Sequence, residues 1–369
     1  RPGDRVLLAD GIVSLRVVTQ DPVAGRVVCQ VVQPGLIRSR QGVNLPGVAL
    51  STPSLTEKDR IDLRWALDHG IDFIGLSFVR RVEDLKLLRT VIAEHKTTTP
   101  PWIVAKIEKA EAIADLDAII AEADAVMVAR GDLGVETDIY RVPGLQKKII
   151  QLCNEHRTPV ITATQMLDSM ITNSSPTRAE ATDCANAVLD GADALMLSGE
   201  TSVGEFAIES VKTMARIIVH TEMKALDRIA SLDAKPTTKG GAITKAATEV
   251  GHIVNAKYLV AFTESGESAR RMAMFRSEIP ILALTPVPGT FNRLALSWGI
   301  EPGIVAPVSH TDDMVKQVDQ WLISHGGAQV GDSVVIVAGA PPGIPGSTNA
   351  LRVHVIGDAV GGRAEAYRS

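Results

Sequence analysis

The chain has 369 residues, of which 45% are hydrophobic, and this is enough for two or three compact domains with buried cores. Its net charge of −5 and its aromatic content of 4% argue against a protein that binds nucleic acid through phosphate contacts and base stacking. No apolar run reaches the ~20 residues that span a bilayer. We therefore expect neither a nucleic acid nor a membrane among its partners.

The cysteines and histidines limit the metal chemistry that the chain can support. Cys29, Cys153 and Cys184 lie far apart without a C-x-x-C pair, which argues against a disulfide scaffold and a thiolate zinc site and favours a cytoplasmic location. The eight histidines are scattered along the sequence. Any metal should therefore be a hard cation that carboxylates hold.

The first part of the chain has the pattern of a small β module. Residues 1–40 alternate apolar and polar residues between turn signals. A capping box from Thr56 to Asp59 then predicts a helix over 57–69. The sequence starts with Arg1 rather than Met, directly before the strand pattern. We expect that further sequence precedes Arg1 in the natural polypeptide.

Beyond this helix, apolar strand patterns alternate with amphipathic helices, as is typical of a buried parallel sheet. The expected strands are 73–78, 103–107, 125–129, 159–164 and 194–198. The expected helices are 81–95, 111–122, 143–156, 177–189 and 205–219. Polar or glycine-rich residues follow the carboxyl end of every strand, and one rim with chemistry from many strands is typical of a TIM (β/α)8-type barrel. These residues are Ser77, Lys106 with Glu108, Arg130 to Asp132, Thr164 with Gln165, and Ser198 to Glu200.

A polar stretch separates this α/β unit from a second α/β pattern. The strands of the second pattern are expected near 257–262, 281–285, 303–306, 333–338 and 351–356. We therefore divide the chain into a β module at 1–40, a barrel portion at 41–222, a linker at 223–240 and a C-terminal α/β domain at 241–369.

Charged side chains at two neighbouring strand ends predict a metal site. Glu108 and Asp132 could together hold a divalent cation such as Mg²⁺ or Mn²⁺ and leave positions open for substrate oxygens. The alternative is that each carboxylate caps a helix or pairs with a surface lysine. Lys106 lies two residues before Glu108, so strand alternation sends both side chains to the same face. A cation at that position favours an anionic substrate.

Three other segments could bind an anion. In Arg130-Gly131-Asp132-Leu133-Gly134, backbone N–H groups can point at a carboxylate or phosphate, although a plain turn would use the same glycines. Thr164 could relay a proton or bind an anion, but threonine at a strand end is ordinary. Thr263 to Ser268 follows a strand and opens a helix, as a phosphate cradle would, while its two glutamates argue against that use.

Five motifs stand in one order along the chain. They are Ile103-Val-Ala-Lys-Ile-Glu108, Met127-Val-Ala-Arg-Gly-Asp-Leu-Gly134, Ala163-Thr-Gln-Met-Leu-Asp-Ser-Met170, Pro176-Thr-Arg-Ala-Glu180, and Ala187-Val-Leu-Asp-Gly-Ala-Asp193 through Leu197-Ser-Gly-Glu-Thr201. Together with Gly42-Val-Asn-Leu-Pro-Gly47 they closely resemble the pyruvate kinase family. The resemblance covers nearly the whole chain.

This resemblance implies transfer of the phosphoryl group of phosphoenolpyruvate to ADP, giving pyruvate and ATP. It implies Glu108 and Asp132 as ligands of Mg²⁺ or Mn²⁺, and Lys106 as the cation that stabilises the moving phosphoryl group and the enolate. Thr164 would belong to the network that delivers a proton to the enolate. The implied substrate-binding residues are Ser77, Lys106, Gly131, Asp132 and Thr164.

The resemblance also implies a domain arrangement. Residues 1–40 would be the C-terminal half of a mobile β-barrel lid domain inserted into the barrel, whose closure excludes water. Strands four to eight of the barrel would be visible, and the C-terminal α/β domain would be regulatory. A K⁺ ion and a homotetrameric assembly are further family features that we expect.

The sequence departs from the family pattern in three places. The three barrel strands that precede the lid in the family are absent, along with an arginine that grips the phosphate and the usual K⁺ ligands. Near the end of the lid the family often has two lysines beside the nucleotide, and Arg40 and Gln41 stand there instead, so Arg40 is the candidate nucleotide contact. The acidic effector loop differs from forms that bind fructose 1,6-bisphosphate. Its candidate binding residues are Thr263, Ser265, Gly266 and Ser268.

Two other functions fit parts of this pattern. A lyase or aldolase on the related phosphoenolpyruvate/pyruvate barrel would use the same metal pair but would not need a nucleotide lid or an appended domain. A catalytically silent protein with the same fold is the second alternative. The pattern of a lid and of an appended C-terminal domain favours the kinase over the lyase. The presence of Lys106, Glu108, Asp132 and Thr164 together argues against a silent protein.

Overall fold

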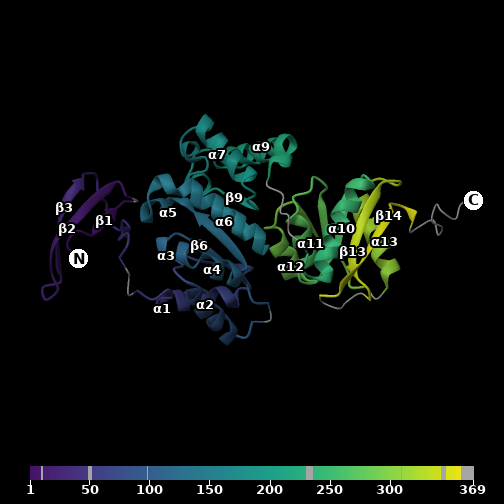
Figure 1. Ribbon diagram of the computed structural model, residues 1–369, viewed down its shortest axis with the longest axis horizontal. Coiled ribbons are helices and arrows are strands. Elements are labelled where there is room, and N and C mark those ends of the chain that lie inside the picture. The colour runs from purple at the N-terminus through teal and green to yellow at the C-terminus, as the bar shows by residue number, and fades with distance from the viewer. Residues whose placement is uncertain are drawn as a thin grey trace, which may run out of the picture. The chain divides into compact units, whose positions relative to one another are not determined.

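A computed structural model describes residues 1–9, 11–48, 52–97, 99–229, 236–308, 310–341 and 346–358. The chain divides into two units, Arg1–Lys224 and Ala225–Ser369 (Figure 1). No helix in the described ranges is long and apolar enough to cross a membrane.

The first unit begins with a four-stranded antiparallel sheet in the order β3-β2-β1-β4. Its strands are β1 (Arg5–Leu8), β2 (Val13–Asp21), β3 (Arg26–Gln33) and β4 (Val43–Asn44). Most of the β3 side chains are exposed, whereas Val13 and Val17 of β2 are buried. The β pattern predicted for residues 1–40 is therefore present, and β4 continues the same sheet to Asn44.

The second sheet of this unit is parallel and has the order β5-β6-β7-β8-β9. Its strands are β5 (Phe73–Leu76), β6 (Trp102–Ile107), β7 (Ala125–Ala129), β8 (Val160–Ala163) and β9 (Ala194–Met196). All five predicted strands are present, and each pairs with the next one in sequence. This is the strand arrangement along one arc of a (β/α) barrel, with β5 and β9 as the edges of the arc.

Helices alternate with these strands, as the sequence predicts. They are α1 (Glu57–Asp68), α2 (Val82–Glu94), α3 (Ala110–Ala114), α4 (Leu116–Glu122), α5 (Arg130–Glu136), α6 (Val142–His156), α7 (Arg178–Leu189), α8 (Gly199–Ser202) and α9 (Ala207–Ala225). Short 3₁₀ turns lie at Ile139–Arg141, Asp168–Ile171 and Leu226–Arg228. Capping boxes at Thr56 and Thr177 fix the starts of α1 and α7, because each threonine accepts a backbone N–H that the helix leaves unpaired.

The helices differ from the prediction at three points. The helix expected over 205–219 extends as α9 to Ala225, into the predicted linker. The helix expected over 111–122 is divided at Asp115, whose backbone leaves the helical region. The helix α5 begins at Arg130 directly after β7, in a segment where the sequence predicts no helix and a plain turn is one alternative. It is held in place because Leu133 is fully buried in the core.

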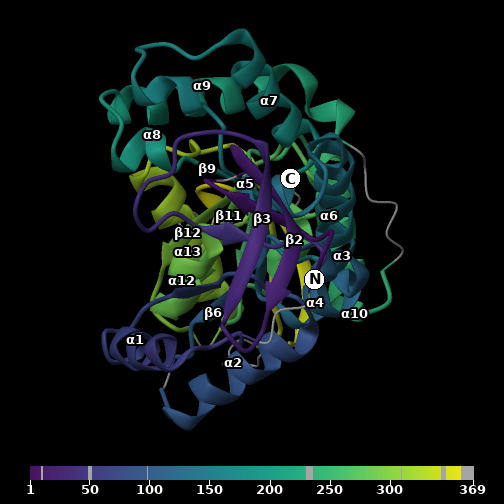
Figure 2. The same ribbon diagram turned by 90° about the vertical axis from the view of Figure 1, so that its left-hand side faces the viewer.

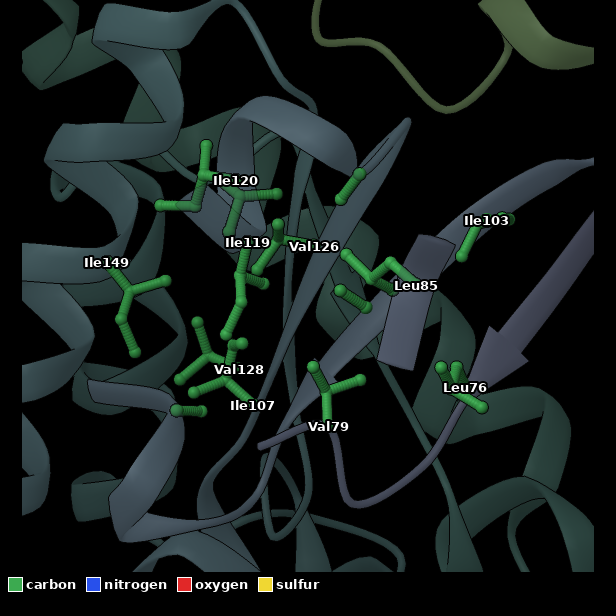
Figure 3. Packing of buried hydrophobic residues seen from close by; sticks show 14 of the residues in the cluster. Leu76, Val79, Leu85, Ile103, Ile107, Ile119, Ile120, Val126, Val128 and Ile149 are labelled. Carbon is green, nitrogen blue, oxygen red and sulfur yellow. The ribbon is translucent and has the colours of Figure 1, made fainter. Parts of the chain in front are cut away.

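The core of the parallel sheet lies between its strands and the helices α2, α4 and α6 (Figure 3). On β6, Ile103, Ala105 and Ile107 are fully buried in this core. Each large aliphatic side chain that is buried in this way stabilises the fold by roughly 1.5–3 kcal/mol. Since alternate residues of a strand face opposite sides, Lys106 projects away from the helices, toward the face that would be the inside of a barrel.

The helices α7 and α9 lie side by side in both views of the molecule (Figure 1, Figure 2). They share a small core with the 3₁₀ turn at Asp168–Ile171. Its buried members include Met170, Cys184 and Met214.

The second unit is an α/β domain, as predicted, and its helices cover both faces of the sheet in three layers. Its sheet has the order β12-β11-β10-β13-β14, with β14 antiparallel to β13 and the other pairs parallel. The strands are β10 (Tyr258–Phe262), β11 (Ile281–Thr285), β12 (Ile300–Ile304), β13 (Ser333–Gly339) and β14 (Thr348–Val355). The helices are α10 (Lys239–Ile253), α11 (Glu267–Ala273), α12 (Pro288–Leu294) and α13 (Thr311–Ser324). The cores on the two faces contain residues of α10, α11 and α12 on one side and of α13 on the other.

Candidate active site

The carboxyl ends of the parallel strands bring together the polar residues that the sequence singled out. The parallel pairing of Leu76 with Ala105, at the ends of β5 and β6, shows how neighbouring strands end together. A pocket of about 740 Å³ lies mainly along β5 and the segments 42–44 and 52–66, and it reaches this rim at Ser77, Lys109 and Asp132. This rim is therefore the candidate active site.

Lys106 is the centre of a polar contact between β5 and β6. Its ammonium donates to Ser77 Oγ at 2.8 Å and lies 2.8 Å from Glu108 Oε1. The Lys106 side chain is 27% exposed, whereas that of Glu108 is only 1% exposed. A buried carboxylate needs a compensating charge, and Lys106 supplies it. The prediction that alternation places Lys106 and Glu108 on the same face is confirmed.

The other oxygen of Glu108 holds the loop after β5. Glu108 Oε2 accepts the backbone N–H of Phe78 at 2.7 Å. Phe78 has a φ of +54°, a left-handed conformation that is unusual for a bulky side chain. Such strain persists only where the surroundings fix it, and it is concentrated at functional sites. Glu108 thus joins the end of β6 to the loop that carries Ser77.

Arg130 fixes the end of β8. Its guanidinium donates to the carbonyl oxygens of Thr164 at 2.7 Å and Ala163 at 3.3 Å, and it pairs with Asp183 at 2.7 Å. The backbone that it binds is left-handed, with φ values of +72° at Thr164 and +52° at Gln165. A planar guanidinium with several donors suits this task because it can bind adjacent carbonyls at once. No single role for Arg130 was predicted from the sequence, because these partners lie 33 or more positions away.

Thr164 and Gly131 are in direct contact. The Gly131 N–H donates to Thr164 Oγ1 at 2.8 Å, and the Thr164 hydroxyl donates to the Ala163 carbonyl at 2.7 Å. The Gly131 N–H and the Thr164 hydroxyl therefore lie close enough to bind the same anionic group. Asp132 follows in the first turn of α5, where the partial positive charge of a helix N-terminus stabilises a carboxylate.

The donor set at the rim suits a hard divalent cation. Within the described ranges, no group of three or more His, Cys, Asp or Glu side chains is arranged to hold a metal ion. Mg²⁺, however, needs only one or two protein carboxylates where substrate phosphate and water supply the remaining oxygens. Glu108 and Asp132 are carboxylates at the ends of adjacent strands, so their chemistry fits this requirement.

Three residues that the sequence analysis did not single out form a buried cluster beside this rim. Lys109 Nζ lies 2.6 Å from Glu136 Oε1, and their side chains are 9% and 2% exposed. Asn44 Nδ2 donates to the same oxygen at 2.9 Å. The signals in the sequence are two consecutive charges, Glu108 and Lys109, after a buried strand, and a glutamate inside the short α5.

Three further side chains bear on the chemistry of the first unit: Arg40, Cys184 and Cys153. Arg40 is exposed in the segment between β3 and β4, and its contact with a nucleotide stays a prediction. Burial, together with the charge of Asp183, raises the pKa of Cys184 to about 12. Burial also raises the pKa of Cys153 well above its ordinary value. Neither thiol is therefore a nucleophile near neutral pH.

The loop from Thr263 to Ser268 in the second unit, whose role as an effector site stays a prediction, is held by hydroxyl groups of its own and of Thr348. Thr263 Oγ1 accepts the N–H of Gly266 at 2.8 Å, and the hydroxyls of Ser268 and Thr348 lie 2.6 Å apart. Ser265 Oγ accepts the backbone N–H of Glu267 at 3.4 Å. The loop lines a pocket of about 130 Å³.

The charge of this loop differs from the sequence-based expectation. Glu267 pairs with Arg270 at 2.9 Å and with Arg271 at 2.8 Å, and Arg271 lines the pocket. The negative charge of Glu267 is thus compensated, which weakens the argument that two glutamates repel an anionic ligand. Both arginines lie on α11, about one helical turn after Glu267.

Comparison with known proteins gives concordant results for both units. Residues 1–211 match the family model "Pyruvate kinase, barrel domain" and residues 241–354 match "Pyruvate kinase, alpha/beta domain". The pyruvate kinase of Corynebacterium glutamicum is 49% identical over 97% of this chain and 74% of its own length. That of Mycobacterium tuberculosis is 51% identical over 96% of this chain and 74% of its own length. A solved pyruvate kinase from Cryptosporidium parvum has a TM-score of 0.88 and 35% identity, and the match covers 96% of this chain and 72% of that one.

Proposed function

The chain belongs to the pyruvate kinase family, metal-dependent enzymes that transfer the phosphoryl group of phosphoenolpyruvate to ADP, and from this premise we propose how its residues carry the reaction. The observation that carries the proposal is the position of Lys106 between the Glu108 carboxylate and the Ser77 hydroxyl at the ends of β5 and β6.

Lys106 is the catalytic cation. Phosphoryl transfer requires charge stabilisation and positioning rather than covalent chemistry by the protein. The ammonium of Lys106 is held by fixed partners, so it is oriented before the substrate arrives and loses little free energy to reorganisation during the reaction. Ser77 belongs to the substrate site as the partner that keeps this ammonium in place.

Glu108 and Asp132 are the ligands of the divalent cation, which is Mg²⁺ or Mn²⁺. When bound, such an ion neutralises phosphate charge and orients the substrate oxygens. Glu108 already has one oxygen on Lys106 and the other on the Phe78 N–H, so its carboxylate is fixed in place. Asp132 approaches from α5 on the neighbouring strand end.

Thr164 and the N–H groups of Gly131 and Asp132 hold the substrate carboxylate. After phosphoryl transfer the enolate needs a proton at its methylene carbon to become pyruvate. The Thr164 hydroxyl, fixed in a left-handed backbone by Arg130, is the group that we assign to this proton-delivery network. The contact between Thr164 and Gly131 supports a shared site for both tasks.

The remaining parts of the chain take the family's supporting roles. We assign residues 1–40 to the lid that covers the nucleotide, with Arg40 as its contact to ADP, 41–222 to the catalytic barrel, 223–240 to a linker and 241–369 to a regulatory domain. K⁺ would serve as a monovalent activator. The three free cysteines suit a reducing cytoplasm.

A homotetramer is the assembly that we propose. Along α9, Ile208, Val211, Val219 and Met223 are 70%, 53%, 54% and 73% exposed. Their spacing places them on one stripe of the helix, an apolar face of the kind that subunit interfaces cover. Sedimentation of the purified protein should give four times the mass of one subunit.

The effector pocket in the second unit would take a ligand with one phosphate. Arg271 is the cation that lines it among the described residues, and the hydroxyls of Thr263, Ser265 and Ser268 could supply further donors. Glu264 lines the same pocket and would oppose a second phosphate. Calorimetry should show binding of a phosphorylated monosaccharide and weaker binding of fructose 1,6-bisphosphate. The reverse order of affinities would contradict this assignment.

The experiment that tests the functional assignment measures pyruvate and ATP in the same sample of the purified protein. With phosphoenolpyruvate, ADP and Mg²⁺ we expect equal amounts of the two products. Without ADP, no pyruvate should form. Pyruvate release that does not need ADP would instead indicate a lyase or phosphatase on the same barrel.

A further inference from the structure

The strongest unassigned feature is the buried cluster of Lys109, Glu136 and Asn44. The ammonium of Lys109 and the side-chain amide of Asn44 converge on a single oxygen, Glu136 Oε1, at 2.6 and 2.9 Å. None of the three residues is among the groups to which we assign contact with the substrate or the metal.

Stability alone is a weak reason for such a pair. Removing two charges from water costs several kcal/mol per ion, and apolar residues of similar size often replace buried ion pairs at no loss of stability. Buried ionic groups are better explained where they fix one arrangement of segments against others. Here the cluster joins segments that are distant in sequence, since Asn44 and Glu136 are 92 positions apart.

Each member of the cluster comes from a segment with its own part in the site. Asn44 ends β4, the last strand of the N-terminal sheet, and pairs there with Leu7 of β1. Lys109 directly follows Glu108, and its ammonium lies 5.6 Å from the centre of the Phe78 ring. Glu136 is the last residue of α5, one turn after Asp132.

The cluster therefore connects three segments. Asn44 connects it through β4 to the N-terminal sheet. Lys109 connects it to Glu108 and to the Phe78 loop that Glu108 binds, and Glu136 connects it through α5 to Asp132. A helix turn and adjacent backbone atoms transmit a displacement because their geometry is rigid.

We propose that Glu136 is a positioning residue that locks the root of the N-terminal sheet to the two segments that carry the metal-binding carboxylates. The inference rests on the proposed roles of Glu108 and Asp132. The hydrogen bond from Asn44 to Glu136 keeps the end of β4 in place while the rest of the sheet moves to cover the nucleotide. The closed sheet then has one defined position relative to the metal site. Without this anchor the metal site remains, but the sheet no longer closes over it in one position.

Asn44→Ala is the most selective test, because it removes one hydrogen bond and leaves the ion pair intact. We expect KM for ADP to rise roughly 3- to 10-fold, which corresponds to about 0.6–1.4 kcal/mol. KM for phosphoenolpyruvate should change less than twofold. The matched control is Asn154→Ala in α6, whose side-chain amide donates to the Gly191 carbonyl at 3.3 Å, near the opposite ends of the strands. It should leave both KM values unchanged.

A double-mutant cycle tests whether Asn44 acts through Glu136. Glu136→Ala removes the acceptor of the Asn44 amide and should raise KM for ADP, since β4 then loses its contact with α5. If the two residues act through one bond, Asn44→Ala in the Glu136→Ala background should produce little further change in KM for ADP. Full additivity of the two effects would overturn the proposal.

Two further outcomes are decisive. If Asn44→Ala lowers the melting temperature but leaves KM for ADP unchanged, the cluster is structural and the inference is wrong. Asp132→Asn, measured in parallel, separates this failure from that of the proposed function. An inactive Asp132→Asn beside a normal Asn44→Ala refutes only the positioning role, whereas a fully active Asp132→Asn refutes the metal site on which that role depends.

Discussion

Replacement of Lys106 by methionine removes a charge and retains most of the side-chain volume. The ammonium lies 2.8 Å from Glu108 Oε1. Two unit charges at that separation interact by roughly 6 kcal/mol at an effective dielectric constant of ~20. Desolvation of the two charges reduces this interaction energy, and so does screening by solvent, because the Lys106 side chain is 27% exposed. Loss of one preorganised electrostatic group typically lowers kcat by about 10²–10³-fold, and we expect an effect of this size.

The assay is the initial rate of pyruvate formation, measured over a range of phosphoenolpyruvate concentrations at saturating ADP and Mg²⁺. Because the charge matters most where negative charge moves in the transition state, kcat should fall far more than KM rises. The matched control is Lys147→Met on α6, which loses an ion pair with Asp190 from an exposed position and should keep normal kinetics. A Lys106→Met enzyme with normal kcat and a raised KM would show that Lys106 only binds the substrate.

Three further predictions concern stability and reactivity. Thr177→Ala removes the cap of α7 and should lower the free energy of unfolding by about 1 kcal/mol in urea titrations. Burial by itself raises the pKa of Glu180, but hydrogen bonds from Ser169 and Thr177 outweigh it, and the net pKa is lowered from its ordinary value of 4.5. The stability that Glu180 contributes is therefore complete above pH 4.5 and lost as the pH falls further, so the deficit of Glu180→Gln should shrink in acid. Iodoacetamide at neutral pH should modify the partly exposed Cys29 and spare Cys184, which mass spectrometry of peptides would check; equal labelling would contradict the burial of Cys184.

Local signals in the sequence were sufficient to predict most of the elements. Apolar runs bounded by polar strand ends located all five strands of the parallel sheet, and the Thr56 box located the start of α1. The prediction was less accurate where two local rules conflict. Gly131 and Gly134 gave no sign of a helix, and a plain turn was one alternative there, but the segment is helical and buries Leu133.

The site could be predicted only where its residues are close in sequence. Strand alternation over two positions is enough to bring Lys106 next to Glu108, and this contact was expected. The Asn44 contact to Glu136 spans 92 positions, and no periodicity within either segment can indicate it. The ion pairs of Glu267 lie within one helical turn and could have been inferred from the i, i+3 and i, i+4 spacing of its arginines.

The most direct test of the central claim is a Mg²⁺ titration of the Asp132→Asn enzyme, with pyruvate and ATP formation as the readout. A neutral amide cannot replace a charged ligand of a hard cation, so turnover at saturating Mg²⁺ should fall by roughly 10²-fold or more. Its thermal stability should stay close to that of the wild type. Wild-type turnover at saturating Mg²⁺ would contradict the assignment of Glu108 and Asp132 as the metal site.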